Sequence, residues 1–265
     1  MNLAKYHANP VLIVPPLVAM ILPLINSIIL VPPSTLEVSA TELATFIFVA
    51  FGVLFLNLII SFLALLGQAS MAGKVVVEGK TRLIDWGKGI KKYFLRVLGI
   101  GLIYLGIMFV FFIPIGIIVV LAMFPQLISV PPPTLPLTPE TSPLISTVMS
   151  WVTVLLMTIA SAVLYTWLAP AVIDDKGVFA SLDAGTKTMR KGGKAFLGFI
   201  ALLCIVSAIA ELIRTFPTYL GLTIQPVFYD GCVTLTQIVS QAIATIFSPL
   251  WFLIAFTIYS EQKLT

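Results

Sequence analysis

Glu211 and Arg214 are ionisable residues that stand near the end of a long apolar run. Positions three apart lie on one face of a helix, so the two side chains can form an ion pair. Ionisable groups at membrane depth are costly, and for that reason they are frequently functional. The pair therefore predicts either part of a polar lining for a solute or ion path, or a salt bridge at the membrane interface.

Amide and hydroxyl side chains recur at steps of three and four in the last apolar run, which places them on one helix face. They are Thr234, Gln237, Gln241, Thr245 and Ser248. With neighbouring spans running in opposite directions, one outward-facing polar cluster is predicted. Its members are Glu211, Arg214, Gln237, Gln241, Asn26 and, nearer the midplane, Asn57. Hydrogen bonds that join helices, each contributing about 0.6 kcal/mol, are the other explanation of the same pattern, and the simpler one.

The residues that most enzymes need are scarce. His7 is the single histidine and precedes the first apolar run, so neither a zinc site nor a Ser–His–Asp triad can be assembled within the membrane. Cys204 lies inside an apolar run and Cys232 at the outer edge of the next, so no disulfide is expected. Phosphate-binding and dinucleotide-binding glycine motifs are missing. We therefore expect no enzymatic activity, no metal and no cofactor.

The composition indicates that lipid surrounds most of the chain. Of its 265 residues, 59% are apolar and 10% are charged, against about 45–50% and 25% in soluble domains. A helix of about 20 apolar residues crosses the hydrocarbon core, and six runs reach that length. They predict one all-α integral membrane domain, residues 1–265, with spans at about 11–31, 44–72, 97–124, 144–173, 195–214 and 233–259.

The basic residues predict the orientation. Fourteen of the 15 Lys and Arg residues fall in the termini and in segments 73–96 and 174–194, which six spans place on one side. Short cytoplasmic loops carry such an excess of Lys and Arg. We therefore predict a multi-pass protein of the cell membrane with both termini in the cytoplasm. The basic pI of about 9.1 then reflects topology, and no nucleic-acid partner is expected.

Each of the two basic segments predicts an amphipathic helix on the inner membrane surface. In the first, Thr81 is a candidate N-cap and Asp85 lies in the opening turn, where the helix dipole favours a carboxylate. In the second, Gly192 and Gly193 end the helix. The residues that could contact anionic lipid are Arg82, Lys88, Lys91, Lys92, Arg96, Lys187, Arg190 and Lys191. The alternative is that both helices are only elbows that return the chain to the bilayer.

The two basic segments align with each other at an offset of 98 residues. A glycine, an aspartate and a second glycine recur at the same spacing: Gly79, Asp85 and Gly87 match Gly177, Asp183 and Gly185. Each copy follows an inward span and precedes an outward one. A parallel internal repeat is therefore predicted, with copies at about 66–106 and 164–204.

The repeated unit is an apolar span ending in Ala72-Gly73 or Pro170-Ala171, a loop with acidic residues and glycine, and an amphipathic Asp-x-Gly turn. This pattern, with the Asn9-Pro10 start, resembles a family of uncharacterised polytopic membrane proteins of archaea and bacteria. That family is similar to the membrane domain attached to some glycerophosphodiester phosphodiesterases. The resemblance implies a six-helix membrane domain. It implies no phosphodiesterase activity, because the soluble catalytic barrel is missing from this sequence.

The sequence thus predicts a non-enzymatic membrane domain that interacts with membrane lipids, a partner subunit or a second copy of itself. The alternative function is a small-solute or ion permease that uses the outward-facing polar cluster. A water-accessible cavity that reaches Glu211 would favour the permease.

Overall fold

The computed structural model describes residues 9–29, 40–128, 143–220 and 226–264. Throughout these ranges the regular structure is helical, because a chain in lipid must satisfy its backbone hydrogen bonds internally. The elements are η1 (Pro10–Ile13), α2 (Val14–Ile29), α3 (Ala40–Glu78), α4 (Leu83–Ile128), α5 (Pro143–Ile173), α6 (Val178–Lys191), α7 (Gly193–Leu220) and α8 (Pro226–Leu264).

Five of the described helices are long and apolar enough to cross a membrane. The stretches are Phe48–Glu78, Leu83–Val110, Ser150–Ile173, Gly193–Phe216 and Ile238–Leu264. A shorter apolar stretch, Pro10–Ile21, falls in the first predicted span, whose last residues, 30 and 31, lie outside the described ranges. The prediction of an all-helical, multi-pass membrane protein is confirmed in this form.

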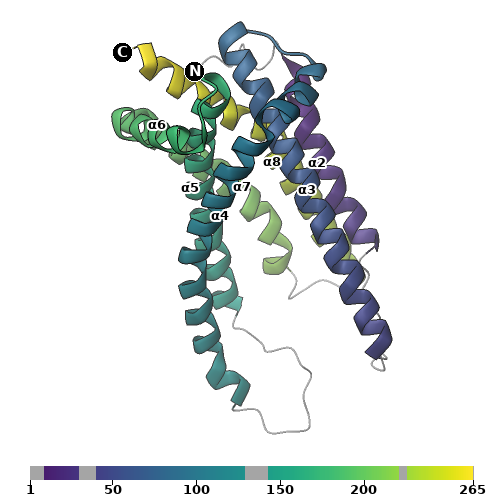
Figure 1. Ribbon diagram of the computed structural model, residues 1–265. Coiled ribbons are helices and arrows are strands. Elements are labelled where there is room, and N and C mark those ends of the chain that lie inside the picture. The colour runs from purple at the N-terminus through teal and green to yellow at the C-terminus, as the bar shows by residue number, and fades with distance from the viewer. Residues whose placement is uncertain (1–8, 30–39, 129–142, 221–225, 265) are drawn as a thin grey trace.

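The helices gather at one end of the bundle and separate toward the other. Figure 1 shows α4 and α5 diverging from α2, α3 and α8, while α6 lies where the helices meet. We call this the α6 end. Away from it, large apolar side chains are exposed, such as Phe48 at 81% and Val110 at 71%. Exposed apolar surface of this extent is typical of protein that contacts lipid.

Aromatic residues of α8 hold the bundle together near the α6 end. The ring of Phe252 lies 4.6 Å from that of Tyr165 in α5 and 5.8 Å from that of Phe256. Trp251 packs against Phe199 in α7 at 6.3 Å between ring centroids. Phe252 and Phe256 are fully buried. The C-terminal half of α8 is therefore the centre of the packed core.

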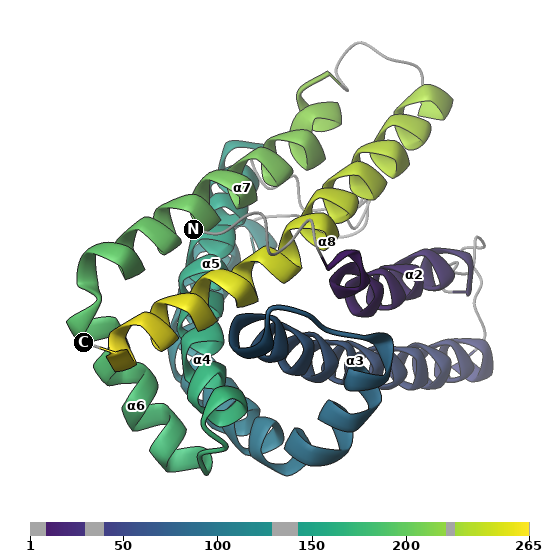
Figure 2. The ribbon, with the colours of Figure 1, turned by 90° about the horizontal axis from the view of Figure 1, so that it is seen from above.

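The first basic segment forms one helix with the span that follows it, which corrects the expectation of a separate surface helix. α4 runs unbroken from Leu83, and in the view from above its first turns run sideways away from α3 (Figure 2). The side chain of Asp85 accepts hydrogen bonds from the Arg82 backbone N–H at 2.9 Å and from the Thr81 hydroxyl at 3.3 Å. Asp85 thus caps the helix, and Thr81 supports that carboxylate. Without a proline in this stretch, nothing interrupts the backbone hydrogen bonds.

The second basic segment is a helix of its own. α6 ends at Lys191 with Gly192 as its C-cap, and α7 begins at Gly193. The predicted stop at this glycine pair is confirmed. α6 approaches α5 closely at Gly185, where an added Cβ would lie 2.8 Å from the carbonyl oxygen of Thr166.

The contacts of the two basic segments do not follow the predicted offset of 98. Asp85 is buried and pairs with Lys74 of α3, whereas Asp183 is exposed and pairs with Lys187 of its own helix. Gly89 and Gly185, in contrast, each pack against a hydroxyl-bearing residue nineteen positions earlier, Ser70 and Thr166. An offset of 96 brings these two contacts into register. The repeat itself stays a prediction.

Candidate functional site

Glu211 and Arg214 form an ion pair in α7 that also includes α5. The Arg214 Nε donates to Glu211 Oε2 at 2.8 Å, and a second guanidinium nitrogen donates to Oε1. Ser150 of α5 donates its hydroxyl to Glu211 and accepts from Arg214 at 2.8 Å. The Glu211 side chain is 5% exposed and the Arg214 side chain 45%. Helix joining is therefore one role of this pair.

Glu211 also lines a cavity of about 480 Å³ between α5, α7 and α8, the α5–α7–α8 cavity. Its polar lining comprises Thr158, Ser161, Ser207, Glu211, Ser240 and Gln241. Along α5 the lining runs from Val154 to Tyr165, which is about 16 Å at the rise of an α-helix. The hydroxyl of Thr158 donates to that of Ser207 across the α5–α7 contact at 3.0 Å. Part of the predicted polar cluster therefore lines a cavity.

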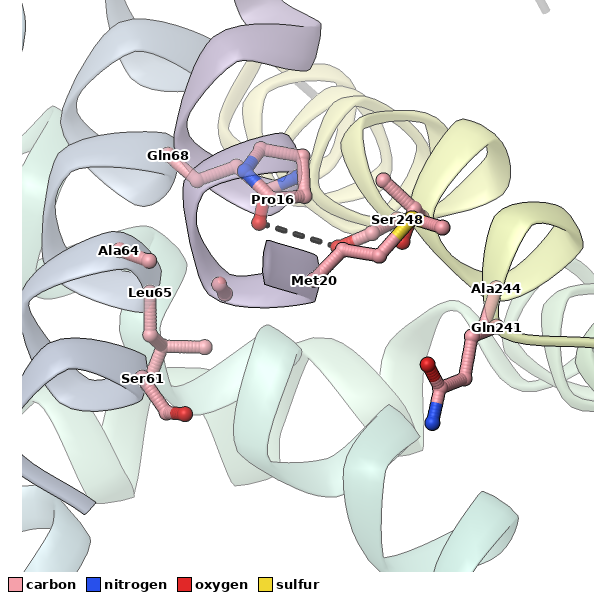
Figure 3. A pocket seen from close by; sticks show the side chains of 11 residues that line it. Pro16, Met20, Ser61, Ala64, Leu65, Gln68, Gln241, Ala244 and Ser248 are labelled. Atoms are coloured by element: carbon pink, nitrogen blue, oxygen red, sulfur yellow. Dashed lines mark hydrogen bonds between the residues drawn. The ribbon is translucent and has the colours of Figure 1, made fainter. Parts of the chain in front are cut away.

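A second cavity, of about 320 Å³, lies between α2, α3 and α8, the α2–α3–α8 cavity. Figure 3 shows Gln68 and Ser61 of α3 facing Ser248 and Gln241 of α8 across it, with Pro16 and Met20 of α2 closing one side. Gln241, Ala244 and Ser248 line both cavities. This stretch of α8, which carries the predicted polar stripe, is therefore a wall between them.

The side-chain amide of Gln68 makes one hydrogen bond, although its Nε2 group could donate others. Its Oε1 accepts from the Ser248 hydroxyl at 3.0 Å, the dashed line in Figure 3. Its Nε2 is buried and has no hydrogen-bond partner among the described residues. The residue is 3% exposed. A buried amide donor normally finds a partner, so Gln68 is an unsatisfied donor on the wall of the α2–α3–α8 cavity.

The structure brings only part of the predicted cluster together. Glu211, Arg214 and Gln241 lie at or beside the α5–α7–α8 cavity, whereas Asn57 lines neither cavity. The side chains of Asn26 and Gln237 lie outside the described part of the chain. Gln68 was not predicted, although it is an amide within an apolar run, the same signal that selected Asn57.

The eight predicted lipid-contact residues divide into two groups. Lys92 and Arg96 of α4 pair with Asp175, the former at 3.2 Å, and Lys187 pairs with Asp183 at 2.6 Å. The other five are exposed and have no ion pair among the described residues: Arg82, Lys88, Lys91, Arg190 and Lys191. Three of the eight cations are therefore already partly neutralised by the protein.

A third cavity, of about 300 Å³, opens among the ends of α3, α4 and α5 close to α6, the α3–α4–α5 cavity. Three ammonium groups line it, those of Lys74, Lys88 and Lys92, together with the carboxylates of Glu78 and Asp85. Lys74 is held by Asp85 at 3.0 Å. Lys88 is thus the cation at this cavity without an ion-pair partner among the described residues.

The corner between α5 and α6 ties three helices together. Asp174 accepts hydrogen bonds from Tyr259 at 2.6 Å and from Lys263 at 2.8 Å, both in α8. Asp175 accepts from Arg96 of α4. Burial alone would raise the pKa of Asp174, but the bonds from Lys263 and Tyr259 outweigh it and hold that pKa below its ordinary value of 3.8. The Arg96 hydrogen bond likewise lowers the pKa of Asp175.

The lowered pKa values of Asp174 and Asp175 predict that the folded protein is less stable in acid. A carboxyl whose pKa is lower when folded stabilises the folded state fully above its unfolded pKa of 3.8, and this contribution is lost as pH falls below that value. We expect the thermal unfolding midpoint in detergent to fall in acid through these groups, with a smaller fall for Asp174→Asn. Asp183→Asn, on the exposed face of α6, is the control. Equal acid sensitivity in wild type and Asp174→Asn would contradict the assignment.

The described residues contain no group of three or more His, Cys, Asp or Glu side chains that could hold a metal ion. Comparisons with protein-family models, with curated proteins and with solved structures found no match to this chain. The resemblance to membrane domains attached to glycerophosphodiester phosphodiesterases therefore stays a prediction.

Proposed function

We propose that the chain is a six-span, non-enzymatic protein of the cell membrane that acts by binding anionic lipid at its α6 end, which faces the cytoplasm. The observation that carries the proposal is the set of exposed cations on α4 and α6 with no ion-pair partner among the described residues. Exposed Lys and Arg beside apolar surface are typical of helices that lie in the membrane interface.

The exposed face of the first α4 turns combines both kinds of side chain. Lys88 and Lys91 are exposed there, and so are Ile84 at 63% and Leu95 at 77%. Exposing these apolar groups to water is unfavourable, and so is burying the lysine ammonium groups in the hydrocarbon core. At the interface the apolar groups enter the lipid, while the lysine stems extend along it and keep their ammonium groups among the headgroups.

α6 presents the same combination. It lies across the bundle where the helices meet (Figure 1), and its first turn exposes Phe179 at 80%. Its last turn carries Arg190 and Lys191. The opposite face packs against the bundle through Ser181, Gly185 and Thr188, which are buried. The cations and Phe179 are therefore left for lipid or solvent.

Lipid binding can be tested on the purified full-length chain in neutral detergent. We expect phosphatidylglycerol to bind more tightly than phosphatidylcholine. The double variant Lys88→Gln/Lys91→Gln should weaken phosphatidylglycerol binding roughly 30-fold, because each cation near an anionic surface contributes about 1 kcal/mol. Lys88→Arg/Lys91→Arg keeps both charges and should bind as wild type does. Equal affinity of the wild-type protein for the two lipids would refute the proposal.

A second candidate, passage of a small solute or ion, is favoured by the α5–α7–α8 cavity that Glu211 and Gln241 line. It predicts flux into vesicles that contain the protein. Gln241→Leu should stop that flux, since it replaces an amide on the wall shared by two cavities. Asn57→Leu, which changes an amide that lines neither cavity, should leave the flux intact. Vesicles with wild-type protein that show no flux would remove this candidate.

A further inference from the structure

We propose that the α2–α3–α8 cavity is a binding site for a neutral ligand that presents a hydroxyl group to the side chain of Gln68. This site is separate from the lipid-binding surface at the α6 end, and neither proposal depends on the other. Three observations support it: the unpartnered amide, the uncharged lining and the position of the cavity along α3.

Gln68 supplies the directional contact. Its Oε1 is already engaged by Ser248 at 3.0 Å, while its buried Nε2 lacks a partner among the described residues. A ligand oxygen that accepts from Nε2 would satisfy that donor. A hydroxyl suits the remaining polar lining as well, because Ser61, Gln241 and Thr245 each donate and accept hydrogen bonds.

The rest of the lining indicates an uncharged ligand with an apolar part. No Asp, Glu, Lys or Arg lines the cavity among the described residues, so a charged ligand would have no counter-ion. Much of the wall is apolar, from Pro16, Ala19 and Met20 of α2 to Leu65 of α3. The volume of about 320 Å³ lies at the lower end of the range for small-ligand sites.

The position along α3 allows two sources of the hydroxyl group. Gln68 lies six residues beyond Lys74 toward the interior of the span, about 9 Å along the helix. At that level the ligand is either a small dissolved polyol or the hydroxyl end of an amphiphile carried by the membrane. Glycerol and 1-decanol are suitable probes, because they share the hydroxyl group and differ in their apolar part.

The binding of each labelled alcohol can be measured by equilibrium dialysis of the full-length protein in detergent against protein-free micelles. We expect saturable binding of at least one alcohol. Gln68→Leu should weaken it at least about fivefold, equivalent to about 1 kcal/mol, through loss of the amide. Asn57→Leu, the same kind of change on the same helix outside the cavity, should bind as wild type does. Glycerol binding alone assigns a dissolved polyol, and decanol binding alone assigns an amphiphile.

The stability of the unliganded variants separates a binding role of Gln68 from a structural one. Gln68→Leu removes an unpartnered buried donor together with the hydrogen bond that Oε1 accepts from Ser248. Relief of the unpartnered donor offsets the loss of that hydrogen bond, about 1 kcal/mol, so the melting temperature should stay close to that of wild type. If Gln68→Leu fails to fold, Ala19→Phe decides, because it fills the cavity from α2 without changing the amide, and it should abolish binding. The proposal is overturned if neither alcohol binds beyond micelle partitioning, if Gln68→Leu or Ala19→Phe binds as wild type does, or if a high-resolution structure with either alcohol shows only water beside Nε2.

Discussion

Replacing Gly185 by alanine is expected to lower the free energy of unfolding by about 1–3 kcal/mol, the usual cost of overpacking. The added Cβ would lie 2.8 Å from the Thr166 carbonyl oxygen and 3.0 Å from the Trp167 Cα. Both are backbone atoms of α5, so no side chain can rotate to make room. α6 would have to move away from α5, and the hydrogen bond from Trp167 Nε1 to the Thr186 hydroxyl, 3.2 Å long, would lengthen with it.

Gly87→Ala is the matched control for Gly185→Ala. Gly87 also lies inside a helix, but an added Cβ there meets nothing within 4 Å. Since glycine in a helix costs about 0.5–1 kcal/mol relative to alanine, Gly87→Ala should leave stability unchanged or raise it slightly. Thermal unfolding midpoints in one detergent compare the two variants. If both move in the same direction, α6 does not pack on α5 at the distance described.

Arg214→Leu should destabilise the protein more than Glu211→Gln, although both break the same ion pair. Without Arg214, a carboxylate whose side chain is 5% exposed keeps only Ser150 as a partner. Removing one member of a buried pair costs up to about 3–5 kcal/mol. Without the Glu211 charge, Arg214 is left 45% exposed and can be solvated. The glutamine also retains an oxygen that accepts from both partners.

The double variant Glu211→Leu/Arg214→Leu completes this series. Apolar replacement of a buried pair is frequently neutral, so the double variant should unfold at a temperature closer to wild type than Arg214→Leu does. The measurement is the thermal midpoint in detergent for all three variants. A greater loss in Glu211→Gln than in Arg214→Leu would mean that the carboxylate is the better solvated member of the pair, contrary to its 5% exposure.

Much of the helical architecture follows from composition, because long apolar runs have few other options in lipid. The helix boundaries could be predicted less well from the composition. The basic segment 73–96 was expected to carry an amphipathic helix separate from the span that follows it. Charged residues are compatible with a continuing helix, however, and α4 therefore includes them. The α6 stop was predictable because Gly192 and Gly193 act on the local backbone.

The contacts at the candidate sites could likewise be predicted only in part. The pairing of Glu211 with Arg214 is local, at i and i+3, and could be predicted from spacing alone. The roles of Ser150 and Gln68 depend on how α5 approaches α7 and how α3 approaches α8, which the spacing does not specify. Asp175, likewise, reaches Arg96 across 79 positions of sequence. No local pattern could show that this cation is already paired.

Gln241, Ala244 and Ser248 form a wall that two cavities share. A molecule on one side that shifts these side chains changes the volume on the other side. The binding free energies at the two cavities are then linked, and the linkage is reciprocal by thermodynamic necessity. A ligand that binds beside Gln68 and moves this wall would therefore act as an effector of the cavity beside Glu211, and the reverse would hold with the same coupling free energy.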